Sequence, residues 1–252
     1  MSKGHLDTVR YLLEKGANAD ASDGTNETPL QYAAREGDTK LMAFLLSKGA
    51  QIDVATRLGT ALQMAAVFSH QDAVKMLLIH GANPNIGSHE NMLKPLYSAI
   101  YTKSWESVEL LLKAGADPND VSCGNSPLVA AARAGRADVV TRLLEAGADP
   151  NYKMNAGLTA LERAAVFCNY QSVGVLFPVT SCIPTYPDWS VAGLLSHVYS
   201  DANKMRPMRW RNFMRQSQKE GLPSRKSSML QQRIGLKRPW TSPLKIQQYC
   251  LT

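Results

Sequence analysis

The 252-residue chain is 44% hydrophobic, a composition that excludes disorder throughout the chain. Its apolar runs stay well below the roughly 18 residues of a membrane span, and its first residues form no apolar signal-peptide core. We therefore expect neither membrane insertion nor export. The net charge of +7 is uneven. Residues 1–201 carry 16 basic and 20 acidic side chains (net −4), and residues 202–252 carry 12 basic and one acidic (net +11), which indicates an acidic body and a basic tail.

A Leu-Leu-x-x-Gly-Ala element recurs along the body of the chain. Its glycines are spaced by 33, 32, 34 and 32 residues. A second element, Thr-Pro-Leu or a variant of it followed by small residues, precedes all but the first copy and keeps phase with it. Self-similarity at this period indicates stacked repeats. The glycines of the first element are Gly16, Gly49, Gly81, Gly115 and Gly147, and the second element begins at Thr28, Thr60, Lys94, Ser126 and Thr159.

The two motifs resemble those of ankyrin repeats over about residues 4–182. The resemblance implies an all-α ankyrin-repeat solenoid of helix-turn-helix repeats joined by short β-hairpin loops. We expect a partial first repeat and about five following repeats within residues 1–182, so that the chain begins inside a longer array. One position departs from the family. The histidine after the leucine is replaced by Gln31, Gln63, Tyr97, Val129 or Glu162, so its hydrogen bond to the threonine is not expected in the same form.

The spacing of each motif has a physical reason. Thr or Ser at the N-cap accepts a backbone N–H, and Pro fits the first helical position. Paired alanines keep the first helix thin, so that neighbouring repeats approach closely. The second helix buries its leucines, and Gly ends it because a left-handed C-cap costs glycine little.

The repeat pattern changes after residue 176. The next Leu-Leu-x-x-Gly-Ala position arrives in phase but reads Leu176-Phe-Pro-Val-Thr-Ser181. A proline-marked connection follows, and then Val191, Leu194, Leu195 and Val198 have helical spacing. We predict a linker and a closing helix over residues 183–200.

The sequence Phe177 to Val198 also resembles the end of the ankyrin part of plant ankyrin–tetratricopeptide (TPR) proteins. That narrower resemblance implies a chain truncated at both ends, because no TPR pattern follows. Residues 201–252 are rich in Arg, Lys, Gln and Ser, and we expect a disordered tail. A second interpretation is that the tail is a frame-shifted TPR segment, since a shifted reading of Ser227 to Leu251 permits a TPR-like translation.

Catalytic and metal-binding signals are absent from the sequence. It contains no GxxxxGK[ST], GxSxG or HExxH motif. Cys123, Cys168, Cys182 and Cys250 form no CxxC pair and have no histidine at metal-ligand spacing. We therefore expect no enzyme, no cofactor and no metal, with idle thiols in a reducing compartment. The cytoplasm is the expected location, and the nucleus is the alternative.

The candidate binding residues follow the small pair on each first helix, where the resemblance implies a concave, partner-facing side. Aromatic and Arg side chains there are typical of interface hot spots. The alternative is that Phe68 and Phe167 only pack against the next helix. Thr25, Glu27 and Arg57 at the hairpin tips would extend the surface. The candidates are Arg35, Glu36, Val67, Phe68, Tyr101, Thr102, Arg133, Val166 and Phe167.

These residues favour a monomeric scaffold or adaptor that binds a partner protein, without catalysis and without membrane contact. The alternative function is a nucleic-acid-associated regulator that uses the basic tail. Trp210, Phe213 and Trp240 lie among the basic residues of that tail, as base-stacking platforms would. We prefer the protein partner over nucleic acid because no DNA- or RNA-binding motif is present.

Overall fold

The computed structural model describes residues 4–22, 27–88, 93–122, 124–154, 157–184, 186 and 188–201. Within these residues the regular structure is helical, which confirms the all-α class. The chain divides into two compact units, residues 1–127 and 128–252. The expected tail of residues 201–252 lies outside the described residues from residue 202 onward.

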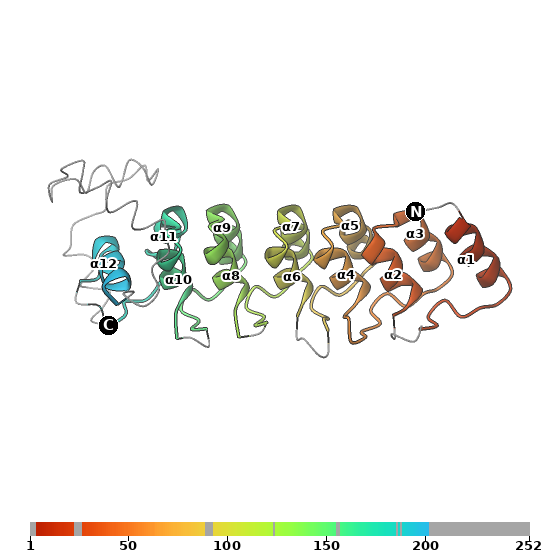
Figure 1. The fold of residues 1–252 in the computed structure, drawn as a ribbon, viewed down its shortest axis with the longest axis horizontal. Helices are drawn as coiled ribbons and strands as arrows, with labels where there is room; N and C mark the ends of the chain where they lie inside the picture. The colour runs from red at the N-terminus through yellow and green to blue at the C-terminus, as the bar shows by residue number, and fades with distance from the viewer. Residues whose placement is uncertain are drawn as a thin grey trace. The chain divides into compact units, whose positions relative to one another are not determined.

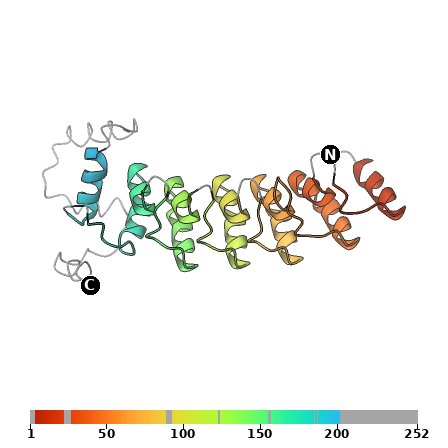
Figure 2. The same cartoon turned by 90° about the horizontal axis from the view of Figure 1, so that it is seen from below.

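Unit 1 consists of helices that pack in two rows (Figures 1 and 2). The first helix of each pair contacts the next first helix, α2 to α4 and α4 to α6, while α3 contacts α5 and α5 contacts α7. Each first helix also packs on its own partner. The helices are α1 (Gly4–Glu14), α2 (Pro29–Glu36), α3 (Thr39–Ser47), α4 (Ala61–Val67), α5 (Gln71–Ile79), α6 (Pro95–Tyr101) and α7 (Trp105–Lys113).

Unit 2 continues the same helix-pair pattern in sequence. Helix α8 (Pro127–Ala134) begins at the unit boundary and is followed by α9 (Ala137–Glu145), α10 (Ala160–Val166) and α11 (Tyr170–Leu176). The last helix described, α12 (Val191–Asp201), covers the residues whose spacing predicts a helix. It packs on α10, which also contacts α11, and α11 contacts α9.

The first helices are short and thin, and α2, α4 and α10 have the N-terminal cap that the repeat motif predicts. Thr28, Thr60 and Thr159 each accept a hydrogen bond from the backbone N–H three residues on. The alanines of these helices are fully buried, including Ala33 and Ala65. Because alanine adds so little width, the backbones of successive first helices come close together.

The Leu-Leu-x-x-Gly-Ala element is a helix C-terminal cap. After α3, the N–H of Ala50 donates to the carbonyl of Leu45 (3.1 Å), and the N–H of Gly49 donates to that of Leu46 (3.0 Å). Gly49 has φ +85°, in the left-handed region. This is the Schellman arrangement, and it recurs after α5, α7 and α9. The predicted helix ends near Gly49, Gly81, Gly115 and Gly147 are therefore confirmed.

In the described residues of the loops between repeats, β pairing is limited to isolated bridges, Thr56 to Gly59 and Ser122 to Asn125. Side-chain acceptors connect one loop to the next. Asp20 accepts the N–H of Gln51 at 2.9 Å, and Asp53 accepts the N–H of Asn83 at 3.0 Å. Each loop therefore fixes the start of the following one.

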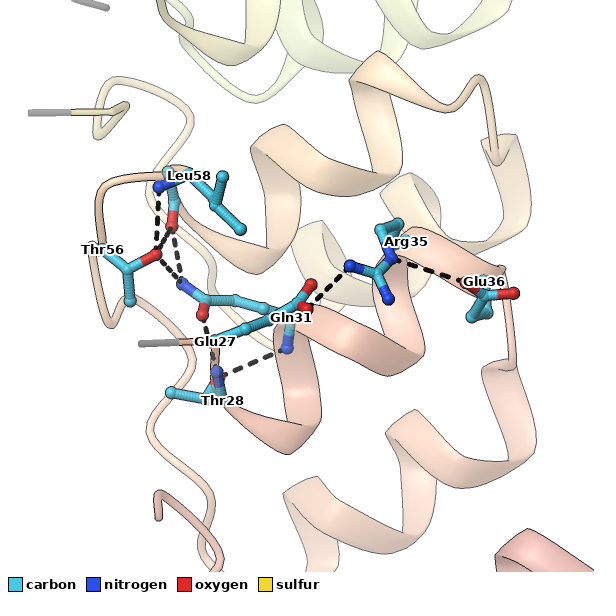
Figure 3. A network of polar contacts seen from close by, with 8 residues as sticks. Glu27, Thr28, Gln31, Arg35, Glu36, Thr56 and Leu58 are labelled. Atoms are coloured by element: carbon cyan, nitrogen blue, oxygen red, sulfur yellow. Dashed lines mark hydrogen bonds and ion pairs between the residues drawn. The ribbon is translucent and has the colours of Figure 1, made fainter. Parts of the chain in front are cut away.

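Gln31 occupies the position at which the ankyrin pattern has a histidine (Figure 3). Its Oε1 accepts the N–H of Thr28 at 2.8 Å, completing a capping box. Its Nε2 donates to the carbonyls of Val54 (3.0 Å) and Gly59 (2.6 Å) in the next loop. An amide that both donates and accepts thus caps its own helix and holds the next repeat.

At the end of the described chain, the same repeat position carries Glu162. Its Oε2 accepts from the backbone N–H and the hydroxyl of Thr159, and its Oε1 accepts the hydroxyl of Tyr186 at 2.7 Å. The Tyr186 ring lies 4.3 Å from the ring of His197 on α12. Trp189 stacks on Phe177 at 5.2 Å. These aromatic side chains therefore form a cluster that connects the segment before α12 to α12 and to Phe177.

Candidate protein-binding surface

The nine candidate residues lie at the C-terminal ends of the first helices, and we call them the first-helix stripe. In unit 1 the stripe exposes large aromatic side chains. Phe68, the C-cap of α4, is 50% exposed, and Tyr101, the last residue of α6, is 72% exposed. Glu36 is also exposed, whereas Val67 is half-buried. Half or more of each aromatic side chain remains open to a partner.

Thr102 has a structural role within the stripe. Its hydroxyl oxygen lies 3.0 Å from the carbonyl oxygen of Ser98 in its own helix and 3.2 Å from that of Ala66 at the end of α4, and the two acceptors share its single hydrogen. The hydroxyl therefore connects one repeat to the one before it. Thr102 positions the neighbouring Tyr101 and offers little polar surface of its own.

Arg35 is held by carboxylates. Its Nη1 lies 2.7 Å from Oε2 of Glu27, and its Nε lies 3.4 Å from Oε1 of Glu36 (Figure 3). Its guanidinium also covers the ring of Tyr32 at 4.9 Å. The sequence prediction for Glu27 is wrong. This side chain is buried beneath Arg35 and adds no hairpin-tip surface.

Of the two other hairpin-tip residues, Arg57 and Thr25, the structure describes only Arg57. Arg57 is exposed and lines a shallow depression with Asp20 and Val54. Thr25 lies outside the described residues. The depression belongs to the loops and contains none of the stripe residues.

In unit 2 the stripe joins cations to one aromatic ring. Phe167, the C-cap of α10, is 43% exposed. The guanidinium of Arg133 lies 5.9 Å from its ring centroid, and that of Arg163 lies 4.9 Å from it. Val166 is half-buried beside it. Arg163 was not among the predicted residues, although it precedes Phe167 by four positions and shares its helix face.

Two side chains that the sequence does not single out as binding residues fix the stripe backbone. His70 Nε2 donates to the carbonyl of Arg35 at 2.9 Å, which assigns the hydrogen to that nitrogen because a carbonyl only accepts. Asn169 Nδ2 donates to the carbonyls of Ala132 (2.8 Å) and Arg133 (3.0 Å). Each bond runs from one repeat to the end of the preceding first helix, so the stripe residues stand on a rigid support.

The charges of the surface suit recognition. Burial and the positive charge of Arg133 lower the pKa of Arg163 from its ordinary value. Elsewhere in unit 2 the guanidinium of Arg136 hydrogen-bonds the carboxylate of Asp138 and lowers its pKa to about 2.

The described residues contain no group of three or more His, Cys, Asp or Glu side chains that could hold a metal ion. The arrangement thus offers rings and fixed charges for binding.

Comparison with known proteins identifies the family. A sequence model described as "Ankyrin repeats (3 copies)" matches residues 1–88, 53–122 and 96–183, which together cover more than half of the chain. The chain belongs to the ankyrin-repeat family. Ankyrin repeats are protein-interaction modules that are generally not catalytic.

Several curated ankyrin-repeat proteins are similar to this chain. An ankyrin repeat protein of Fowlpox virus (strain NVSL) is 32% identical over 149 residues, which cover 55% of this chain and 43% of the viral protein. An ankyrin repeat and KH domain-containing protein of Caenorhabditis briggsae is 37% identical over 154 residues, or 61% of this chain and 6% of that protein. Mouse ankyrin repeat, SAM and basic leucine zipper domain-containing protein 1 is 33% identical over 142 residues, or 56% and 24%.

The chain therefore spans less than half the length of these ankyrin-repeat relatives. They come from a virus, a nematode and a mouse, and they support the family without the narrower resemblance to plant ankyrin–TPR proteins. Among the described residues, no helix combines the length and the apolar character that a membrane crossing requires.

Proposed function

We propose that this ankyrin-repeat chain acts as a scaffold or adaptor and binds a partner protein through the first-helix stripe. The observation that carries the proposal is the exposure of Phe68, Tyr101 and Phe167 at helix ends. Exposed aromatic rings on a rigid support are the usual anchors of protein interfaces, because they bury much apolar area at little conformational cost.

The support of these rings favours binding over random surface exposure. Thr102 fixes the end of α4 from the following repeat, and Asn169 fixes the end of α8 in unit 2. A side chain whose backbone is already ordered loses less entropy when a partner binds. The stripe is therefore pre-organised in each unit.

The experiment compares Phe68→Ala and Tyr101→Ala with Ile79→Ala in the full chain. Ile79 ends α5, outside the stripe, and is 72% exposed, as Tyr101 is. Proteins captured from an extract are quantified for each variant, and the affinity of the main captured protein is measured. We expect the stripe variants to weaken binding roughly thirtyfold, since an anchor residue contributes about 2 kcal/mol, and Ile79→Ala to have no effect.

Thermal unfolding of the same variants distinguishes an anchor from a packing residue. Both aromatic side chains are half exposed or more, so we expect melting temperatures close to that of the wild type. A fall of several degrees together with weaker binding would assign the rings to the core. Unchanged affinity in both variants would remove these residues from the interface.

Two narrower proposals rest on composition and resemblance. The charge of +11 in residues 202–252 supports nucleic-acid association. Salt-dependent binding of RNA or DNA that disappears when the tail is deleted would favour that function over a protein partner.

The resemblance to plant ankyrin–TPR proteins supports a co-chaperone-like adaptor, and the DNA around the codon for Ser227 tests the frame-shift explanation of the tail.

A further inference from the structure

A pair of arginines in unit 2 converges on a single aromatic ring. Arg163 lies on α10, four residues before Phe167, and Arg133 lies near the end of α8. Their guanidinium carbons are 4.9 and 5.9 Å from the Phe167 ring centroid. Two cations beside one ring repel each other, as the effect of Arg133 on the pKa of Arg163 shows, and the ring quadrupole offsets only part of that repulsion.

Neither arginine has a counter-ion within the described part of the chain. Two other arginines of unit 2 do have a counter-ion. Arg136, the N-cap of α9, pairs with Asp138, and Arg142 within α9 pairs with Glu145 at 3.1 Å. For Arg133 and Arg163 the structure gives only the ring contacts. The Nε of Arg163 is buried and has no hydrogen-bond partner among the described residues. A buried donor that is left unpaired costs free energy.

The surroundings favour a single carboxylate over a chain of phosphates. Residues 1–201 carry a net charge of −4, so a nucleic acid that needs several phosphate contacts meets repulsion beyond this pair. One carboxylate fits the fork of a guanidinium in a bidentate manner. Phe167, which is 43% exposed, leaves apolar ring surface beside it for a neighbouring apolar side chain.

We propose that Arg133, Arg163 and Phe167 form a recognition site for an acidic peptide segment of the partner protein. The guanidinium groups bind an Asp or Glu carboxylate, and the exposed ring contacts an adjacent apolar side chain. This inference rests on the proposed function and specifies its chemistry in unit 2. The aromatic residues of unit 1 then contribute apolar contact, and the arginines of unit 2 select for acidic sequences.

The test uses a random peptide library displayed on phage and selected on the full chain. We expect the selected peptides to be enriched in Asp and Glu. For the best binder, a synthetic peptide and its Glu→Gln or Asp→Asn version are titrated against the wild type, Arg133→Gln, Arg163→Gln and the control Arg142→Gln. We expect Arg133→Gln and Arg163→Gln each to lose about tenfold in affinity, because each removes a charged hydrogen-bond donor, and to discriminate less between the two peptides.

A conservative variant separates charge from geometry. Arg163→Lys keeps the charge but loses the fork, so it should recover only part of the affinity. Melting temperatures of all variants exclude unfolding as the cause. The control Arg142→Gln should bind as the wild type does, because Arg142 is exposed and already paired with Glu145.

Each other outcome counts against a defined statement. Peptides without acidic enrichment, or binding that survives Arg133→Gln and Arg163→Gln, overturn the inference, and loss of binding in Phe68→Ala would then still support the proposed function. If acidic peptides bind in a way that requires the arginines but not Phe68 or Tyr101, the inference is supported and the unit 1 residues of the stripe are excluded from the interface. If no peptide is selected, both the proposed function and the acidic-peptide inference are overturned. If an RNA oligonucleotide binds and its binding depends on the same arginines, the ligand of the site is a nucleic acid and the peptide inference is overturned.

Discussion

Arg35 in unit 1 and Arg133 in unit 2 occupy the same position of the repeat but have opposite surroundings. Arg35 is bound to the buried Glu27 and to Glu36, and it covers the Tyr32 ring. Arg133 shares the Phe167 ring with a second arginine and has no counter-ion in the described residues. The same helix end therefore neutralises its charge in one unit and presents it in the other. Repeat position fixes where a side chain stands, and neighbouring repeats decide what it does there.

The largest loss of stability is expected when a buried leucine that is equivalent in the two units is truncated. Leu111 and Leu143 are fully buried at equivalent positions, and each accepts the Schellman hydrogen bond at the end of its helix. Leu111→Ala and Leu143→Ala should each lower the free energy of unfolding by about 2–5 kcal/mol. Urea denaturation gives the loss, and hydrogen exchange shows which unit opens. A change below about 0.5 kcal/mol in either variant would mean that the two cores are not equivalent.

The arginine comparison itself predicts unequal stability effects. Arg35→Ala removes the ion pair between Arg35 and the buried Glu27, so we expect a loss of about 1–3 kcal/mol, less than for a fully buried pair because Arg35 is 30% exposed. Arg133→Ala should cost under about 0.5 kcal/mol. The double variant Arg35→Ala with Glu27→Gln should recover part of the loss. Equal effects in urea denaturation for Arg35→Ala and Arg133→Ala would remove the distinction.

A glycine precedes the second helix in both units. Gly37 and Gly135 have φ of +69° and +75°, and an added Cβ would lie 2.6 Å from the His70 ring or 2.7 Å from Asn169 Oδ1. Gly49, at φ +85°, has open space there. Gly49→Ala should cost about 1–2 kcal/mol for the left-handed backbone alone. Gly37→Ala and Gly135→Ala should cost about 1 kcal/mol more, because the displaced side chain loses its hydrogen bond.

Thermal unfolding of the three alanine variants measures the difference. When Gly37→Ala is measured in a His70→Ala background, its cost relative to that background should fall to that of Gly49→Ala, because no ring is then displaced. If Gly37→Ala and Gly49→Ala are equally destabilising, the close contact with His70 does not hold the stripe.

The smallest effect is expected from a paired charge of unit 2. The pKa of Asp138 is lowered from 3.8 to about 2, chiefly by its hydrogen bond to Arg136. A carboxyl with a depressed pKa in the folded state stabilises the protein above its unfolded pKa, and this contribution is lost as the pH falls from about 4 through about 2. The side chain is 63% exposed, so the effect should stay below about 0.5 kcal/mol. Asp138→Asn should flatten the stability curve over that pH range, and an unchanged curve would contradict the pairing.

The sequence predicted the helix pairs because their signals are local. Thr60 and Gly81 act through bonds to residues within five positions, so each cap can be read from its own segment. The role of Gln31 could not be read in this way. Its amide reaches Val54 and Gly59 in the following repeat, and nothing near Gln31 in the sequence indicates that contact.

The candidate surface was predictable in position and less so in chemistry. The resemblance to ankyrin repeats placed Phe68 and Tyr101 on the partner-facing side of the first helices, and the structure finds both side chains exposed. It gave no sign that Thr102 connects two repeats or that Glu27 lies buried under Arg35. These side chains are polar and sit next to turns, where solvent exposure is the ordinary expectation.

By itself, the sequence determined that this chain is a stack of helix pairs, because capping, helix width and the burial of leucines repeat with a fixed period. Only the tertiary structure decided which charges of the stripe are neutralised. Whether Arg35 meets Glu27, or Arg133 meets Phe167 and Arg163, depends on side chains brought together from different segments. Coulomb interactions act over the few ångströms that folding creates, and distance along the chain does not encode them.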